Sequence, residues 1–112
     1  TVLNAVEKIE KQPLSPTEQG LVLAYLYRSY ELYGDAINVL EDLVNQGNKE
    51  ISVYQLLGDT YLEVGLPQLA KNTYQKGLEL AIKTQNIPAQ TTIEKMLRQV
   101  NDLLGNKSYS KY

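Results

Sequence analysis

The two residue types that most often perform catalysis or bind transition metals are missing from this chain. Histidine and cysteine are both absent, so the commonest general base, the thiolate nucleophile and the usual transition-metal ligands are missing. Three carboxylate pairs could share a proton or bind a cation: Glu41–Asp42, Glu7–Glu10 and Glu31–Asp35. Neighbours in sequence do not face one another on a helix, and the two wider spacings are typical of exposed helix faces. The chain also lacks a glycine-rich phosphate loop. We therefore expect no enzyme, no metal site and no cofactor.

All nine aromatic residues are tyrosines. They could line a ligand groove or fill a core. Four of them fall on a repeating pattern described below and are predicted to be core residues: Tyr27, Tyr54, Tyr61 and Tyr74. Tyr30 and Tyr33 are predicted to pack between helices. Tyr25 lies on the other side of its predicted helix from Tyr27, and it is either a partner-binding residue or an ordinary exposed one.

Composition limits the classes of partner. The chain has 112 residues and a net charge of −2, with acidic and basic residues mixed along its length. No basic face is evident, so we expect neither nucleic acid nor an anionic membrane surface as a partner. The longest apolar runs are much shorter than a membrane span. The chain begins at Thr1, and we expect it to be a piece of a longer protein. The lack of cysteine leaves the compartment open.

Helix boundaries are marked by capping residues and glycines. Ser15-Pro16-Thr17-Glu18 predicts a helix start, with a serine cap, proline in the first turn and glutamate three residues after the cap. Tyr33-Gly34-Asp35 is predicted to break that helix. Gly47 and Gly65 are predicted to end later helices, because glycine readily adopts the left-handed conformation of a helix C-cap. Asn48 is predicted to cap the next helix.

These signals predict one all-α domain over residues 1–105, containing two helical hairpins at 17–50 and 51–84 with a flanking helix at 2–12 and another at 88–104. Gly105 is predicted to end the last helix. Residues 106–112 are short, polar and aperiodic, so a disordered tail is expected there. The helix at 2–12 is either the second helix of an earlier hairpin or a free-standing cap.

The hairpins repeat with a fixed period of about 34 residues. The second copy reads Tyr54-x2-Leu57-Gly58-x2-Tyr61, followed by Ala70-x3-Tyr74. One period earlier, the corresponding residues are Leu23, Ala24, Tyr27, Ala36 and Leu40. Large apolar residues replace large ones and small residues replace small ones. A fixed period of this length is typical of stacked helical hairpins. The small residues are expected where two helices cross closely, with the tyrosines filling the space beside them.

This pattern resembles the tetratricopeptide repeat (TPR) family, with Tyr54 in place of the usual tryptophan. The copy at 17–50 is a weaker match, because Gly20 replaces the first aromatic residue, Ala24 the glycine and Leu40 the second aromatic residue. The resemblance implies a right-handed α-helical solenoid whose first helices line a concave face. Six residues of this face are the candidate partner-binding residues: Leu21, Tyr25, Arg28, Gln55, Asp59 and Leu62.

The function implied by this resemblance is non-catalytic binding of a partner protein or peptide on the concave face. Binding of a chaperone C-terminal carboxylate is not expected, because Leu21 and Tyr25 replace the required basic and amide residues and Asp59 would repel the carboxylate. The alternative is a structural spacer or self-association segment with no separate ligand. A homo-oligomer could then form through exposed end helices, where Val2, Val6 and Ile9 would be partly uncovered.

Overall fold

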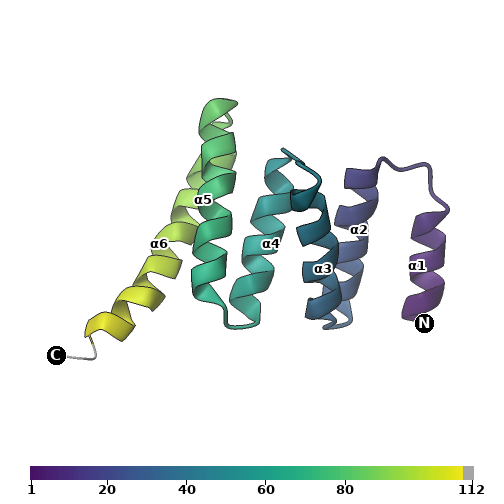
Figure 1. The fold of residues 1–112 in the computed structure, drawn as a ribbon, viewed down its shortest axis with the longest axis horizontal. Helices are drawn as coiled ribbons and strands as arrows, with labels where there is room; N and C mark the ends of the chain where they lie inside the picture. The colour runs from purple at the N-terminus through teal and green to yellow at the C-terminus, as the bar shows by residue number, and fades with distance from the viewer. Residues whose placement is uncertain (110–112) are drawn as a thin grey trace.

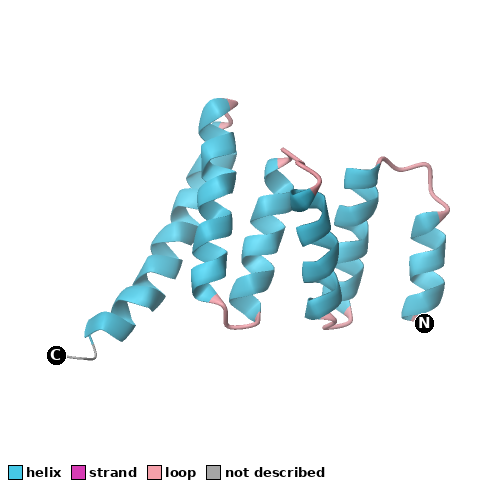
Figure 2. Cartoon of the chain, in the orientation of Figure 1, coloured by secondary structure: helices cyan, strands magenta, loops and turns pink. Residues whose placement is uncertain are grey.

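The computed structural model describes residues 1–109 of the chain. Six α-helices and no strands are present in this part. The helices are α1 (Val2–Glu10), α2 (Pro16–Ser29), α3 (Tyr33–Asn45), α4 (Ile51–Glu63), α5 (Pro67–Lys83) and α6 (Ile87–Tyr109). They stand side by side in a row that runs from α1 at one end to α6 at the other (Figures 1 and 2).

Each helix packs mainly on the helices that precede and follow it in the chain. The shape is therefore elongated, with extents of 54 × 33 × 22 Å and a radius of gyration of 15.3 Å. A globular domain of this length would have a radius of gyration of about 13 Å. Elongation of this kind gives a large surface for the size of the chain, and it follows from hairpins that contact only their neighbours.

The start of α2 confirms the capping prediction. The Ser15 hydroxyl accepts a hydrogen bond from the Glu18 backbone N–H at 3.1 Å, and the Glu18 carboxylate accepts one from the Ser15 N–H at 3.0 Å. Pro16 occupies the first turn. These reciprocal bonds satisfy donors that have no partner inside the helix, and they lower the pKa of Glu18 below its ordinary value.

The four turns that connect successive helices from α2 to α6 all have the same geometry. In each, one residue has a positive φ: Glu31 (59°), Gly47 (81°), Gly65 (78°) and Gln85 (56°). The next residue donates its backbone N–H to the carbonyl five residues earlier, as in Leu32 to Tyr27 at 2.8 Å and Leu66 to Tyr61 at 2.9 Å. This bond is the mark of a Schellman C-cap. The predicted helix ends at Gly47 and Gly65 are confirmed.

The predicted break at Tyr33-Gly34-Asp35 is wrong. Those three residues begin α3, and the turn lies at 30–32. The residue that takes the left-handed conformation is Glu31, which lies one repeat period before Gly65. Gly34, the nearest glycine, suggests a later turn, but it lies inside α3 and does not adopt a positive φ. Tyr30, predicted to pack between helices, lies on this turn and is half exposed.

Asn48 does not cap α4; the residue before that helix is Glu50, which makes no side-chain capping bond. Asn48 instead joins three parts of the chain. Its side-chain amide donates to the Thr17 hydroxyl at 2.6 Å, its side-chain oxygen accepts the Glu50 N–H at 2.8 Å, and its backbone carbonyl accepts the Tyr54 hydroxyl at 2.9 Å. These bonds fix the turn between the two hairpins against the start of α2.

Small residues lie at the helix crossings, as the repeat predicts. Ala24, Ala36 and Ala70 are fully buried, and Gly58 is buried on α4. A methyl group at Gly58 would lie 2.5 Å from the ring of Tyr74, which is closer than any real contact allows. Tyr54, Tyr61 and Tyr74 are core residues, and Tyr27 is partly buried and packs against the core cluster. The core therefore runs along the row of helices.

The last helix is longer than predicted. Helix α6 continues through Gly105 to Tyr109, so the predicted stop at Gly105 is wrong. Glycine destabilises a helix interior by only about 1 kcal/mol relative to alanine, and Gly105 does not adopt a positive φ. Residues 106–109, predicted to be disordered, are helical, and 110–112 lie outside the described residues.

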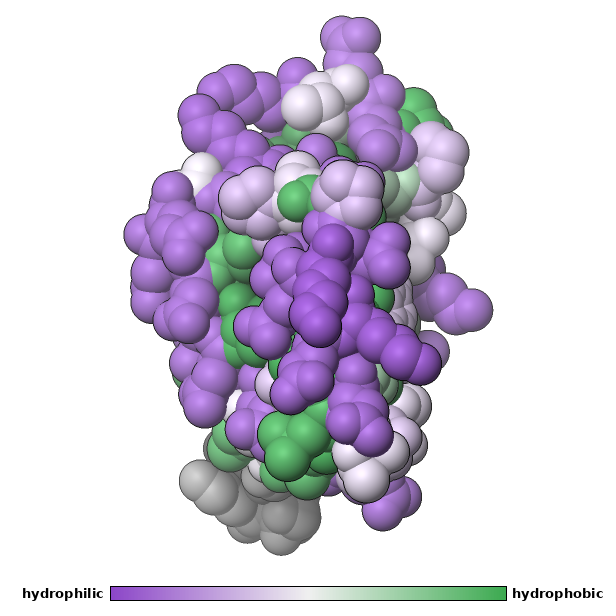
Figure 3. Space-filling model, turned by 90° about the vertical axis from the view of Figure 1, so that its right-hand side faces the viewer, coloured by the Kyte–Doolittle hydropathy of each residue, from purple (hydrophilic) through white to green (hydrophobic). Residues whose placement is uncertain are grey.

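Helix α1 packs on α2, and none of its residues is fully buried. Val2, Val6 and Ile9 are half-buried, while Leu3 is 71% exposed. The end of the molecule formed by α1 is largely hydrophilic, with apolar side chains gathered near its lower end and along one side (Figure 3). A polar outer face is typical of a helix that caps an array.

Candidate functional site

The six candidate residues lie on two neighbouring first helices. Leu21, Tyr25 and Arg28 are on α2, and Gln55, Asp59 and Leu62 occupy the equivalent positions one repeat period later, on α4. Within each helix the three residues are spaced so that they lie on one side. We refer to the side of α2 and α4 that carries these six residues as the α2/α4 face.

Tyr25 is the most accessible large side chain of this set, with 60% of its surface exposed. Its neighbour Val22 is 41% exposed. Leu21 and Leu62 are partly buried and pack against the core, so they contribute more to stability than to an accessible surface. Gln55 is partly exposed. The part of the α2/α4 face that is open to a partner is therefore centred on Tyr25.

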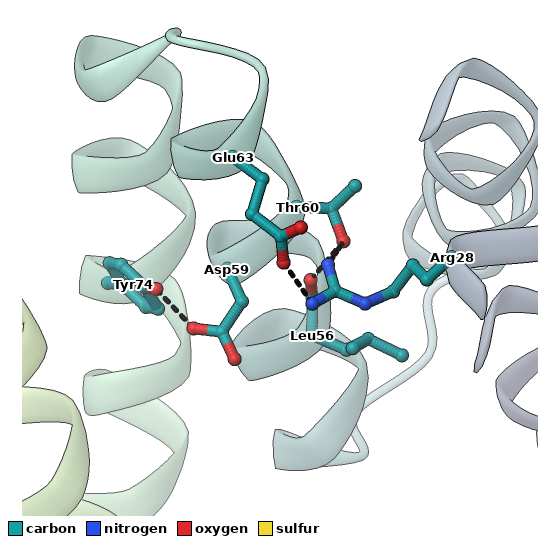
Figure 4. A network of polar contacts seen from close by, with 6 residues as sticks. All are labelled: Arg28, Leu56, Asp59, Thr60, Glu63 and Tyr74. Atoms are coloured by element: carbon teal, nitrogen blue, oxygen red, sulfur yellow. Dashed lines mark hydrogen bonds and ion pairs between the residues drawn. The ribbon is translucent and has the colours of Figure 1, made fainter. Parts of the chain in front are cut away.

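Arg28 is engaged within the chain. One guanidinium nitrogen, Nη1, donates to the Thr60 hydroxyl at 2.6 Å, and Nη2 forms an ion pair with the Glu63 carboxylate (Figure 4). Thr60 is fully buried, and its hydroxyl donates in turn to the Leu56 carbonyl at 2.7 Å. Arg28 therefore connects the two hairpins through a continuous chain of hydrogen bonds that ends on the backbone of α4.

Asp59 is also engaged within the chain, because it accepts a hydrogen bond from the Tyr74 hydroxyl on α5 (Figure 4). Burial raises the pKa of the Asp59 carboxyl, and the Tyr74 hydrogen bond and the positive charge of Arg28 offset this only in part. Burial and the Asp59 carboxylate together raise the pKa of Tyr74. Asp59 thus positions the largest fully buried side chain of the core.

The fold of this chain is similar to that of a solved protein structure. No protein-family model matches the sequence, and no curated protein sequence is significantly similar to it. The fold, however, matches the solution NMR structure of a tetratricopeptide repeat domain protein from Salinibacter ruber with a TM-score of 0.74. The two chains are 20% identical over 83% of this chain and 93% of the other. The chain has a TPR-like fold.

The helix pairs α2–α3 and α4–α5 are the two hairpins that the repeat pattern predicts. Their first helices, α2 and α4, are linked by the contacts of Arg28 with Thr60 and Glu63. The all-α prediction and the predicted resemblance to this fold are confirmed. At 20% identity the comparison shows the architecture and does not transfer a partner or a binding residue.

The sequence did not identify Thr60 and Glu63 as the partners of Arg28. The Glu63 carboxylate is also the main cause that raises the pKa of the nearby Tyr33 hydroxyl. The contacts of Arg28 join residues 32 and 35 positions apart in the chain. An offset close to the repeat period is the one sequence signal that could have suggested them.

The described residues contain no group of three or more metal-ligating side chains that could hold an ion. Over the same residues, no helix has the length and apolar character needed to cross a membrane. The α2/α4 face presents the exposed Tyr25 side chain together with Arg28 and Asp59, whose polar groups are paired inside the chain.

Proposed function

We propose that this chain is a non-catalytic protein-binding module whose partner contacts the α2/α4 face. The observation that supports this is the exposure of Tyr25, at 60%, beside the exposed Val22 on a surface otherwise held rigid by internal bonds. A tyrosine supplies a large contact area with few rotatable bonds, which is why it is common among residues that dominate binding energy. TPR-like folds are generally interaction or scaffold modules, which is consistent with this role.

The six predicted residues do not contribute equally in this proposal. Tyr25 and Gln55 are the contact residues, and Val22 joins them. Arg28 and Asp59 act by positioning α2, α4 and α5, because their polar groups are already paired inside the chain. A partner that displaced these pairs would have to replace charge-assisted hydrogen bonds. Substituting Arg28 or Asp59 would therefore confuse loss of binding with loss of structure.

The test compares two tyrosines of similar exposure. Immobilised wild type, Tyr25→Ala and Tyr30→Ala would be used to capture proteins from a lysate of the source organism. We expect a protein that is retained by wild type and by Tyr30→Ala and is lost with Tyr25→Ala. Circular dichroism should give the same helical content for all three. Retention of every captured protein by Tyr25→Ala would reject the α2/α4 face as the binding surface.

The alternative role, a spacer or self-association segment, has less support. It requires an apolar surface at an end of the array, and the α1 end is largely hydrophilic apart from its lower end and one side (Figure 3). Sedimentation of the chain over a range of concentrations would measure this directly. A mass that rises with concentration would favour the alternative.

A further inference from the structure

Two clefts lie on either side of α3, away from the α2/α4 face. The α3/α5 cleft has a volume of about 410 Å³. Its lining includes the apolar residues Val44, Leu57 and Leu69 and the polar residues Asn45, Asn72 and Glu41. The α2/α3 cleft has a volume of about 340 Å³. Its lining includes the apolar residues Leu23, Val39 and Leu43 and the polar residues Gln19, Gln46 and Asp42.

The two clefts are related by the repeat. Leu23 in the α2/α3 cleft lies one repeat period before Leu57 in the α3/α5 cleft. Each cleft combines apolar side chains with two side-chain amides, from Gln19 and Gln46 in one and Asn45 and Asn72 in the other. Amides both donate and accept hydrogen bonds. They can therefore pair with the free backbone groups of an extended peptide, whereas the backbone of a helical peptide is already paired.

Helix α3 forms an acidic ridge between the clefts. It contains Asp35, Glu41 and Asp42 and no lysine or arginine. Asp42 is exposed, and it borders the α2/α3 cleft, whereas Glu41 borders the α3/α5 cleft. Glu41 also accepts a hydrogen bond from Tyr61. Lys76 borders the α3/α5 cleft, but it lies on α5, so the complementary charge for the ridge itself is positive.

We propose that the α3 ridge and its two clefts form a second protein-binding surface, which accepts an extended segment of a partner protein. The segment has an apolar residue at one position, a basic residue two positions later and a second apolar residue four positions after the first. In an extended chain these three side chains lie on the same face. The two apolar residues are about 13 Å apart, which matches the width of about 10–12 Å of the helix they must straddle. Each apolar side chain enters one cleft, and the basic one meets the ridge.

The test uses a fluorescein-labelled heptapeptide, Gly-Leu-Ser-Arg-Ser-Leu-Gly, and measures its binding by fluorescence anisotropy. Replacing both leucines by serine, or the arginine by glutamate, should weaken binding at least about tenfold. Two protein variants should have a similar effect: Asp42→Lys at the ridge and Leu69→Ser in the α3/α5 cleft. The glutamate peptide should bind Asp42→Lys more tightly than it binds wild type.

Two matched controls lie elsewhere on the chain. Asp102→Lys makes the same charge change on an exposed site of α6, and Leu103→Ser makes the same polar change at a leucine that is 52% exposed. Neither should alter the affinity. Tyr25→Ala should not alter it either, which separates this surface from the α2/α4 face. Absence of binding to wild type at about 1 mM protein, or equal weakening by Asp42→Lys and Asp102→Lys, would overturn the proposal.

Discussion

The ring of Tyr74 occupies the space that a side chain at Gly58 would need. A β-carbon built at Gly58 lies 2.5 Å from Cε1 and 2.7 Å from Cδ1 of Tyr74, and Tyr74 is fully buried. In the preceding hairpin, one repeat period earlier, the corresponding pair is Ala24 and Leu40, both also fully buried. The two hairpins thus solve the same crossing in different ways: a larger ring faces a glycine, and a smaller leucine faces an alanine.

We therefore expect Gly58→Ala to be destabilising through overpacking, by about 1–3 kcal/mol, partly offset by about 1 kcal/mol of helix propensity. In a Tyr74→Leu background the ring is gone, so Gly58→Ala should become neutral or stabilising. Urea unfolding of the wild type, both single variants and the double variant measures this coupling. An equal effect of Gly58→Ala in both backgrounds would show that the ring is not the cause.

Alkaline pH should destabilise this chain through two buried tyrosines. Burial is the main cause of the raised pKa of Tyr61 and Tyr74, and each donates its hydroxyl to a carboxylate, Glu41 and Asp59 respectively. The folded state holds these protons more tightly than the unfolded state. Stability is therefore fully present below the ordinary tyrosine pKa of 10.0 and is lost as the pH rises above it.

The measurement is the urea midpoint as a function of pH, together with the near-ultraviolet absorbance of tyrosinate. Two tyrosines should remain protonated until the chain unfolds. Tyr61→Phe should reduce the dependence of the midpoint on pH above 10, and Tyr25→Phe at an exposed position is the matched control. If the two variants behave identically, buried tyrosine ionisation does not drive the alkaline transition.

At acidic pH, Asp59 should change the stability of the fold in the opposite direction from an ordinary paired carboxylate, whose pKa is lowered by folding. Its pKa is raised by burial, so the folded state binds this proton more tightly than the unfolded state does. Its contribution to stability is present below the unfolded-state pKa and is lost as the pH rises through the folded-state value. Asp59→Asn retains an acceptor for the Tyr74 hydroxyl. Relative to this variant, wild type should gain stability as the pH falls from neutral, as measured by urea unfolding at a series of pH values.

Glu31 has a left-handed backbone conformation, with φ of 59°. This conformation is unfavourable for glutamate, as for most residues that have a side chain. The equivalent turn of the next hairpin uses Gly65 at 78°. Glu31→Gly should therefore stabilise the chain by about 1 kcal/mol, with Gln85→Gly giving a similar gain. Gly65→Ala, the reverse change, should destabilise it by a comparable amount. Thermal unfolding would measure all three, and a loss of stability in Glu31→Gly would mean that the glutamate side chain makes a contact worth more than the backbone strain.

The sequence alone determined the repeating unit of this protein. The repeat period, the Ser15–Glu18 capping box and the glycine turns at Gly47 and Gly65 all depend on interactions within a few residues of one another, and these leave a direct pattern in the sequence. The small residues at 24, 36, 58 and 70 followed from that period, because the same crossing recurs in each hairpin.

Only the tertiary structure decided what the side chains of the surface are paired with. Arg28 and Asp59 had the residue types and positions of binding residues, yet Thr60, Glu63 and Tyr74 satisfy them from other helices. The turn at Glu31 and the continuation of α6 through Gly105 were equally hidden. Such pairings depend on the register and crossing of helices that are distant in sequence, and a shift of one residue along a helix would rotate a side chain by about 100° away from its partner.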